Sequence, residues 1–182
     1  MKKLFIMVAL AATTLFVSAE NYKNSIGINV GSFYGLTYKG FFTDNMAFQA
    51  DLGVNLMQTV GNLVVSSSLG NVTTSGNLCA YTFEFNPNLI YQNDIQSFSW
   101  GNLYWLAGLG VNVGFIDNLQ NAGTAIQFKW GINAIGGIEL KLANSPFVFS
   151  VDFRPGYGMS IPNTGICNFF DWKTVAGIKY AF

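Results

Sequence analysis

The chain ends in the sequence FDWKTVAGIKYAF, which runs from Phe170 to Phe182. Its even positions are mostly large and apolar: Phe170, Trp172, Thr174, Ala176, Ile178, Tyr180 and Phe182. Its odd positions are charged or mostly small: Asp171, Lys173, Val175, Gly177, Lys179 and Ala181. Because successive side chains of a β-strand point to opposite faces, this period of two predicts a strand with one apolar face and one polar face.

The same alternation occurs earlier in the chain, at residues 36–42, 46–56, 81–92, 103–113, 126–142 and 147–157. A shorter segment near Ile26, Ile28 and Val30 completes a set of eight strands. The charged residues of the longer segments all lie on the face opposite to the apolar one: Lys39, Asp51, Glu84, Lys129, Glu139, Lys141, Asp152, Arg154, Asp171, Lys173 and Lys179. The chain is therefore predicted to be an all-β protein of eight strands.

Composition shows what surrounds these strands. The chain has 182 residues, of which 10% are charged and 51% are hydrophobic. A soluble domain has about 25% charged residues, so something other than water is expected to cover part of this surface. No stretch after residue 19 has the ~18 uninterrupted apolar residues of a membrane-spanning helix. In hydrocarbon only a helix or a closed sheet satisfies the backbone polar groups, which leaves a closed barrel.

Side-chain size indicates which face of the barrel points outward. Eight strands leave an interior just wide enough for small side chains, and Trp105, Trp130 and Trp172 are too large for it. The apolar face is therefore expected to meet lipid and the charged face to line the lumen. Aromatic residues cluster near the strand ends, as in membrane-barrel girdles: Phe42, Tyr91, Trp105, Phe147, Tyr157, Trp172, Tyr180 and Phe182. The alternative is a soluble, lipocalin-like barrel with the two faces exchanged.

Connection lengths support an eight-stranded antiparallel up-and-down transmembrane β-barrel. Residues 43–45 and 143–146 read as tight turns, whereas 57–79, 114–125 and 158–169 read as long loops. Short inner turns and long outer loops alternate in membrane barrels, although the connection at 93–102 fits this pattern less well. Within 57–79, the sequence Leu69-Gly70-Asn71-Val72 suits the turn of a projecting hairpin as an alternative. The segment 126–142 exceeds the 9 to 11 residues needed to cross a membrane, so the wall is expected to project outward.

The first nineteen residues predict an export signal. Lys2 and Lys3 precede the apolar run from Leu4 to Val17, and Val17-Ser18-Ala19 supplies small residues at the cleavage site. Residues 1–19 are expected to be a cleaved signal peptide and residues 20–182 the barrel domain. The alternative, an uncleaved anchor helix, needs about 20 apolar residues, which this run lacks.

The ending Gly177-Ile178-Lys179-Tyr180-Ala181-Phe182 matches the pattern Gly-x-x-aromatic-x-aromatic. On this motif and the strand pattern, the chain resembles the small eight-stranded outer-membrane barrels of the OmpX, OmpW and OmpA-barrel type. The resemblance implies a place in the outer membrane of a Gram-negative-type bacterium, in contact with its lipid. It also implies that the barrel-assembly machinery reads Gly177, Tyr180 and Phe182 during biogenesis. Ala176 stands where this family usually has a polar residue.

Charges of both signs on the inner face predict a plugged lumen. Around the turn at 43–45, antiparallel register places Lys39 diagonal to Asp51. Arg154 is expected to centre a mid-barrel network, because several charges lie at similar heights when counted from the inner turns. The network residues are Lys39, Asp51, Glu84, Glu139, Asp152, Arg154, Asp171 and Lys173. Two interpretations stay open, a structural polar core and a gated ion path or binding site.

Catalysis and cofactors find no support in the sequence. The chain has no His, the commonest general base and metal ligand, and its formal charge is zero. No catalytic residue, metal site or cofactor is expected, and a nucleic-acid partner is not expected either. Cys79 and Cys167 lie near the outer ends of strands in an exported chain, so a disulfide is one expectation and two free thiols the other. Strands on opposite sides of the barrel would keep the two cysteines apart.

Two functions remain on this evidence. The OmpX resemblance implies a non-catalytic surface barrel that contributes to envelope structure, adhesion or defence through its protruding strands and loops, with an external surface partner. The OmpW resemblance implies a narrow passive conduit for small hydrophobic molecules. Apolar residues in the 57–79 segment could line a hydrophobic entrance or extend the sheet: Val60, Leu63, Val64, Val65 and Leu69.

Overall fold

The computed structural model describes residues 22–59, 62–67, 70–75, 78–117, 127–161 and 167–182. Within these residues the chain forms ten strands: β1 (Asn24–Gly31), β2 (Phe33–Phe41), β3 (Met46–Thr59), β4 (Asn62–Ser67), β5 (Gly70–Ser75), β6 (Leu78–Phe98), β7 (Gly101–Asp117), β8 (Gln127–Leu142), β9 (Phe147–Ile161) and β10 (Cys167–Ala181). The described residues include no helix long and apolar enough to cross a bilayer.

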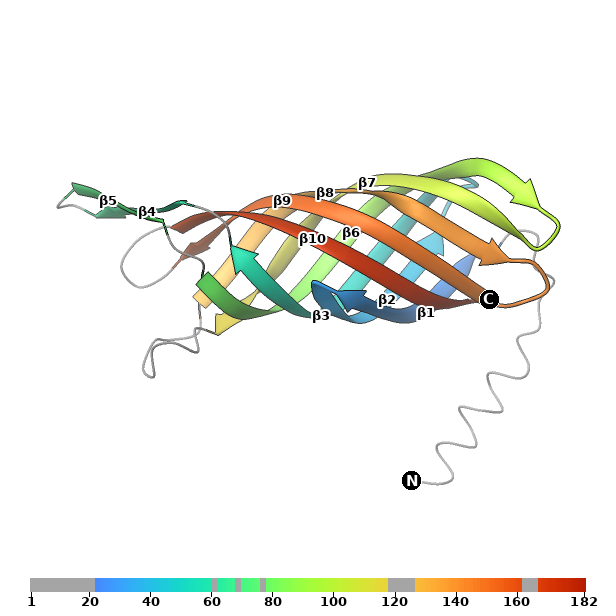
Figure 1. Ribbon diagram of the computed structural model, residues 1–182, viewed down its shortest axis with the longest axis horizontal. Coiled ribbons are helices and arrows are strands. Elements are labelled where there is room, and N and C mark those ends of the chain that lie inside the picture. Colours follow the sequence, from blue (N-terminus) through green and yellow to red (C-terminus); the bar gives the residue numbers. More distant parts are fainter. Residues whose placement is uncertain (1–21, 60–61, 68–69, 76–77, 118–126, 162–166) are drawn as a thin grey trace, which may run out of the picture.

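Eight of these strands close into one barrel in the order β1-β10-β9-β8-β7-β6-β3-β2, and every pair is antiparallel (Figure 1). Each barrel strand pairs with the next one along the chain, and β1 pairs with β10 to close the wall. The predicted up-and-down topology is confirmed. The remaining strands, β4 and β5, pair only with each other and form a hairpin that projects beyond the barrel.

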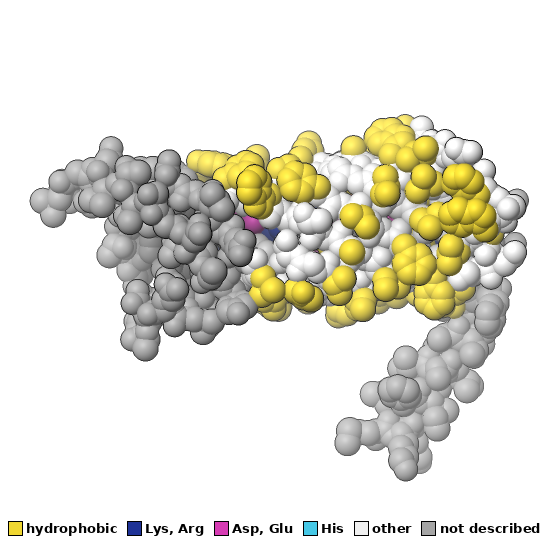
Figure 2. All heavy atoms as spheres, in the orientation of Figure 1, with side chains coloured by type: hydrophobic (Ala, Val, Ile, Leu, Met, Phe, Trp, Pro, Cys, Tyr) yellow, Lys and Arg dark blue, Asp and Glu magenta, His cyan; other side chains and the backbone are white. Residues whose placement is uncertain are grey.

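The two faces of the wall have the polarity expected of a membrane barrel. Outward side chains such as Leu109 and Ile132 are 71% and 60% exposed, whereas Lys39, Glu84 and Glu139 are 0% exposed. Figure 2 shows hydrophobic side chains spread over the visible wall, with only a trace of charged atoms. The soluble alternative with exchanged faces is wrong, because it would put the charges outside.

The first barrel strand, β1, begins at the same rim where the last strand, β10, ends, and we call this the inner rim. The backbones of Asn24 and Phe182 exchange two hydrogen bonds there, at 3.0 and 2.8 Å. The short connections from β2 to β3, β6 to β7 and β8 to β9 lie at the same rim, and Asn144 in the last of them has a positive φ of 57°. The hairpin β4–β5 lies at the opposite, outer rim (Figure 1).

One of the connections predicted at the inner rim, the loose one at 93–102, is wrong. Instead of a loose connection at 93–102, β6 continues to Phe98 and only Ser99 and Trp100 separate it from β7. The register shifts between Asp94 and Gln96, and this bulge hides the period of two from a sequence reading. In the segment 57–79 a projecting hairpin of β4 and β5 forms, as in the alternative, but Gly70, Asn71 and Val72 pair within β5 and do not form its turn.

The wall is lowest where β1 meets β2. These are short strands of 8 and 9 residues, and Ser32 alone joins them. The tight connection uses Gly31 at φ 122°, a conformation that other residues rarely adopt. Ser32 links its two neighbours, because its N–H donates to Thr174 O at 3.0 Å and its carbonyl accepts from Leu56 N at 2.8 Å. Phe33, just below, is fully buried and is an exception to the outward aromatic pattern.

Candidate functional site

The candidate site is the lumen itself, because the period of two brings charged side chains from six strands onto the barrel axis. These residues are nearly or fully buried: Lys39, Asp51, Glu84, Lys129, Glu139, Lys141, Asp152, Arg154, Asp171, Lys173 and Lys179. Isolated buried charges are costly, so their partners decide whether the barrel is stable. Most of them form three clusters that follow one another from the inner rim to the outer rim.

The inner cluster consists of Tyr22, Lys39, Gln92, Glu139 and Lys179. Glu139 accepts hydrogen bonds from Lys39 at 2.9 Å and from Lys179 at 2.8 Å, one on each carboxylate oxygen. The hydroxyl of Tyr22 also donates to Glu139, and Lys39 donates to the side-chain oxygen of Gln92. Tyr22 precedes β1, so its side chain covers the lumen at the inner rim.

Tyr22 is held firmly in this position. Its ring packs edge-on against Phe41, with ring centroids 5.3 Å apart. Burial and the adjacent Glu139 carboxylate raise the pKa of the Tyr22 hydroxyl well above its usual value of 10.0. The hydroxyl therefore stays protonated and remains a hydrogen-bond donor at any physiological pH.

The middle cluster consists of Arg154, Asp51 and Asp152 with the amides around them. Arg154 Nη1 lies 2.7 Å from Asp51 Oδ2, while its Nε and Nη2 donate to Asp152, the latter at 3.2 Å. Asp51 accepts further hydrogen bonds from side-chain amides, at 3.0 to 3.2 Å, namely those of Asn29, Gln49 and Asn88. The guanidinium thus binds two carboxylates in a fork that suits its planar geometry.

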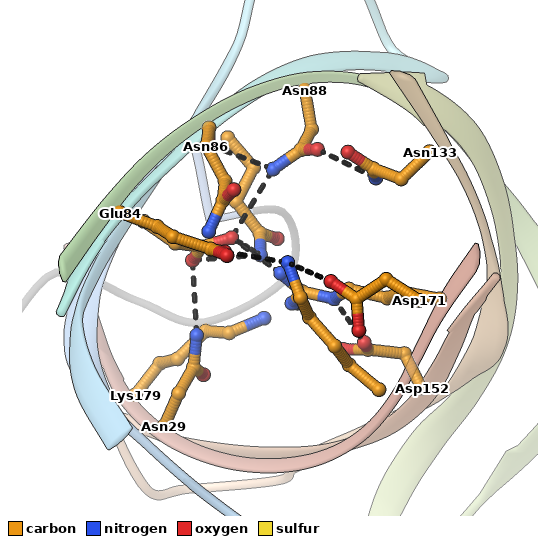
Figure 3. A network of polar contacts seen from close by, with 12 residues as sticks. Asn29, Glu84, Asn86, Asn88, Asn133, Asp152, Asp171 and Lys179 are labelled. Atoms are coloured by element: carbon orange, nitrogen blue, oxygen red, sulfur yellow. Dashed lines mark hydrogen bonds and ion pairs between the residues drawn. The ribbon is translucent and has the colours of Figure 1, made fainter. Parts of the chain in front are cut away.

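The outer cluster consists of Glu84, Lys129, Asp171 and Lys173 with Asn55. Glu84 lies 2.6 Å from both Lys129 and Lys173, one on each oxygen. Asp171 lies 3.3 Å and 3.4 Å from the same two lysines. The amide of Asn55 donates to both Glu84 and Asp171, at 3.1 and 3.2 Å. Figure 3 shows side chains of the outer and middle clusters converging from opposite parts of the wall.

The three clusters nearly balance their charges. The inner cluster has two lysines and one glutamate, the middle has one arginine and two aspartates, and the outer has two of each sign. The single excess positive charge of the inner cluster is therefore offset by the excess negative charge of the middle one. Taken together, the three clusters are neutral, which limits the cost of burying so many ions.

The pairing differs from the prediction in two respects. Lys39 binds Glu139 across the lumen and not Asp51, whose carboxylate is occupied by Arg154 and three amides. Arg154 centres only the middle cluster, while Glu84, Asp171 and Lys173 belong to the outer one. Barrel strands are tilted, so equal counts from different inner turns do not give equal heights.

Two lysines were missing from the predicted network, although their parity placed them on the inner face. Lys129 binds the outer carboxylates and Lys179 binds Glu139. The position of each lysine in the period of two was the available signal. No local sequence pattern shows which carboxylate lies opposite each lysine across the lumen. Lys141, also inward, binds the backbone carbonyls of Leu142 and Ser145 at the inner rim, at 3.3 and 2.5 Å.

Amide side chains cover the luminal face of β6, β7 and β8. Asn133 donates to Asn88 at 3.2 Å, and Asn88 donates in turn to Asp51 at 3.1 Å (Figure 3). Several of these buried amides keep atoms with no hydrogen-bond partner in the described structure: both side-chain atoms of Asn86, and the oxygens of Asn112 and Asn133. These amides are less completely hydrogen-bonded than the charged groups of the three clusters.

Of the predicted assembly signal, Gly177 and Tyr180 lie in the last part of β10, and Phe182 follows this strand at the inner rim. Gly177 faces inward, and a Cβ there would meet Ser150 Oγ at 2.6 Å and Asn29 Oδ1 at 2.9 Å. The ring of Tyr180 packs edge-on against Phe147, with centroids 6.4 Å apart, and Phe182 bonds to Asn24. These contacts account for the residues within the folded barrel, and recognition by the assembly machinery stays a prediction.

The two cysteines lie on opposite sides of the barrel. Cys79 is in β6 and Cys167 begins β10, and three strands separate β6 from β10 in either direction. Their side chains fall outside the described part of the structure, so the disulfide stays a prediction. Val60 and Leu69 lie outside the described residues as well, and for Leu63, Val64 and Val65 the structure describes only their place in β4.

The described part of the chain contains no group of three or more His, Cys, Asp or Glu side chains placed to hold a metal ion. The carboxylates of the three clusters are each bound by Lys or Arg instead. The arrangement therefore suits a neutralised, closed lumen.

Comparison with known proteins supports the fold. No family model and no curated protein matches the chain. The chain is similar to the crystal structure of the N-terminal β-barrel domain of Pseudomonas aeruginosa OprF, with a TM-score of 0.52 and 14% identity over 87% of this chain and 95% of that one. It also aligns with Ail, the attachment invasion locus protein of Yersinia pestis, with a TM-score of 0.33 and 12% identity over 86% of this chain and 93% of that one.

Proposed function

We propose that this chain, which has the fold of the small eight-stranded outer-membrane barrels, is a non-catalytic outer-membrane protein with a plugged lumen that acts through its outer rim. One observation carries the proposal. The wall is apolar outside, and the buried charges inside, except Lys141, are paired in three successive clusters, so the barrel suits a bilayer and we expect its lumen to be closed to ions. Its role would be envelope structure or surface interaction, in adhesion or defence.

The outer rim supplies the surface for such a role. The hairpin β4–β5 projects beyond the wall and pairs with no barrel strand, so it can contact a partner while the barrel stays intact (Figure 1). The long strands β6, β7 and β8, of 21, 17 and 16 residues, exceed the 9 to 11 residues that cross a membrane. The partner on the external side is unidentified.

Single-channel conductance in a planar bilayer tests the plug. The refolded protein is expected to stay silent, because the three clusters together form one continuous plug. Arg154→Ala breaks the middle cluster and leaves Asp51 and Asp152 without their cation, so openings are expected to appear in this variant. Lys141→Ala is the matched control, since it also removes an inward cation but breaks no ion pair. Discrete openings in the unaltered protein would overturn the plugged lumen.

The surface role needs its own test. Cells that carry the protein are compared with cells that carry a variant in which residues 62–75 are replaced by a short Gly-Ser linker, and both are scored for attachment and for resistance to host defence. Loss of either property at equal surface amounts supports the proposal. Equal behaviour of the two strains contradicts a role for the hairpin.

A second candidate is a narrow passive conduit for small hydrophobic molecules. It is favoured by the low wall at Ser32 and by the apolar cluster of Ile90, Leu106 and Ile135 inside the lumen. Uptake of an apolar dye into proteoliposomes tests it directly. Faster uptake than in protein-free vesicles would favour the conduit, and equal uptake would favour the plugged barrel.

A further inference from the structure

We infer that a groove in the outer wall, crossing β6 to β9, binds one acyl chain of a membrane lipid. The inference rests on the proposed function, since it requires that the barrel stand in a bilayer. It goes beyond that function because it assigns a specific ligand site to a surface otherwise described only as apolar.

Two prolines create the groove. Pro87 in β6 and Pro155 in β9 lie inside barrel strands, where a proline cannot donate to a ladder. Pro87 keeps its register with Ala50 of β3, but the β6–β7 ladder skips it. Pro155 likewise keeps its register with Trp172 of β10, while the β8–β9 ladder skips it. The hairpin of β7 and β8 is thus flanked by two interrupted ladders.

The two interruptions lie close to one row of paired residues on the wall. Leu89 of β6 pairs with Leu109 of β7, and Leu109 pairs with Ala134 of β8. The next residue in this row, on β9, is Pro155, and Pro87 lies two residues from Leu89. Two of the four positions in this row, Ala134 and Pro155, have a small or cyclic side chain, so the wall carries little side-chain bulk there.

The resulting groove has a volume of about 710 Å³. Its walls are large outward side chains, among them Leu109, Ile132 and Tyr157, and its floor includes Ala134, both prolines and the glycines Gly110 and Gly156. Ligand sites in proteins typically have about 300 to 1,000 Å³ and a mostly apolar lining. The groove therefore has the size and the chemistry of a site for a flexible hydrocarbon chain.

The position of the groove in the wall indicates which ligand it binds. The groove lies in the middle part of strands whose outward faces are apolar from rim to rim, so bilayer hydrocarbon is the medium that reaches it. Water-soluble ligands are excluded at this depth. An acyl chain is flexible enough to follow a groove that winds across four strands, whereas a rigid apolar wall of a second copy would bridge over it.

The groove also touches the interior. Its floor includes Asn88 and Asn133, and Asn133 donates to Asn88, which donates to Asp51 of the middle cluster. A chain that fills the groove would hold β7 and β8 against β6 and β9 at the two interrupted ladders. The site therefore links lipid occupancy to the packing of the lumen.

A matched pair of alanines tests the inference. Ala134 and Ala107 both point outward on β8 and β7, but only Ala134 lines the groove. The protein, Ala134→Phe and Ala107→Phe are purified from bacterial membranes in a mild detergent and examined by native mass spectrometry. We expect one phospholipid to remain on the protein and on Ala107→Phe, and its occupancy to fall at least fivefold in Ala134→Phe.

Cross-linking locates the bound chain. In nanodiscs of phosphatidylcholine with a diazirine on one acyl chain, cross-links are expected to concentrate on peptides that contain Ile132 and Tyr157, and to disappear in Ala134→Phe. Equal lipid retention by all three proteins would overturn the inference. Dimers that Ala134→Phe abolishes would also overturn it, in favour of a second copy in the groove.

The same samples separate this inference from the proposed function. Heat-modifiable migration on gels and recovery from the membrane fraction report whether the barrel is folded and inserted. A folded, inserted barrel without a retained lipid contradicts the groove site alone. A chain that is absent from the membrane fraction contradicts the proposed function as well.

Discussion

At the residue scale, Glu139 shows how much the lumen depends on single carboxylates. It is fully buried and is bound by Lys39, Lys179 and Tyr22. Removing its charge leaves two buried lysines without their anion, and breaking a buried ion pair typically costs about 3 to 5 kcal/mol. We expect Glu139→Gln to lower the free energy of unfolding by about 3 kcal/mol, because the amide keeps the shape but not the charge.

Urea unfolding in detergent micelles measures this loss. Lys141→Gln is the control, because Lys141 is buried at the same rim but binds only backbone carbonyls, and we expect a loss of about 1 kcal/mol. If Glu139→Gln unfolds at the same urea concentration as Lys141→Gln, the inner cluster does not stabilise the barrel.

Tyr22 predicts a specific loss of stability at alkaline pH. Burial and Glu139 raise the pKa of its hydroxyl above 10.0, so the folded state keeps a proton that the unfolded chain releases. The contribution of Tyr22 to stability is therefore fully present below pH 10 and decreases as the pH rises above it. We expect the unaltered protein to lose more stability between pH 9 and 11 than Tyr22→Phe does.

Tyrosinate absorbance checks the same point independently of stability. One tyrosine of the folded protein should resist titration at high pH, and Tyr22→Phe should abolish that resistant fraction. Complete titration of all tyrosines in the folded protein would show that the Tyr22 hydroxyl is open to solvent.

The polar lumen was partly predictable at this scale. Strand parity placed the charged side chains on the inner face, as Glu84 and Arg154 illustrate. Their partners were not predictable, because an ion pair such as Lys39 with Glu139 joins strands that are far apart in sequence and tilted relative to the barrel axis. Tyr22 was missed because it lies outside any alternating segment.

At the element scale, strands in this barrel depend on glycines where their backbones approach. Gly53 of β3 faces Gly35 of β2, and a Cβ on Gly53 would lie 2.1 Å from the carbonyl oxygen of Tyr34. Gly136 of β8 points outward, and a Cβ there would meet no atom within 4 Å. We expect Gly53→Ala to destabilise the barrel by about 1 to 3 kcal/mol, because the ladder must shift.

Gly136→Ala is the matched control in the same unfolding assay. It is expected to be neutral or slightly stabilising, because it lowers the conformational entropy of the unfolded chain without a clash. Equal effects of the two substitutions would mean that β2 and β3 separate freely at Gly53.

Strand existence was predictable at this scale, and strand ends were not. The period of two is strong in β8 and β10, where most outward residues are apolar and most inward residues are charged, polar or small. In β6 the bulge at Asp94 and Gln96 breaks the period, so the inner part of the strand was read as a loose connection. The segment that holds β4 and β5 resembles a loop, because it is rich in Ser, Thr, Asn and Gly and its two strands join no barrel ladder.

At the scale of the whole molecule, one asymmetry orients the barrel. The short turns, the start of β1 and the end of β10 lie at the inner rim, while β4–β5 projects from the outer rim (Figure 1). In outer-membrane barrels the short turns face the periplasm and the longer loops face outward. The hairpin should therefore be exposed at the cell surface, and the turn between β8 and β9 should be hidden from it.

Epitope tags test this orientation in intact cells. A tag inserted after Ser67, between β4 and β5, should bind antibody on intact cells, because no barrel ladder includes that point. A tag after Asn144, in the turn between β8 and β9, should bind only after the outer membrane is permeabilised. Both variants should migrate as folded barrels on unheated gels. Labelling in the reverse order would invert the proposed orientation, and failure to label either tag before permeabilisation would place the protein away from the cell surface.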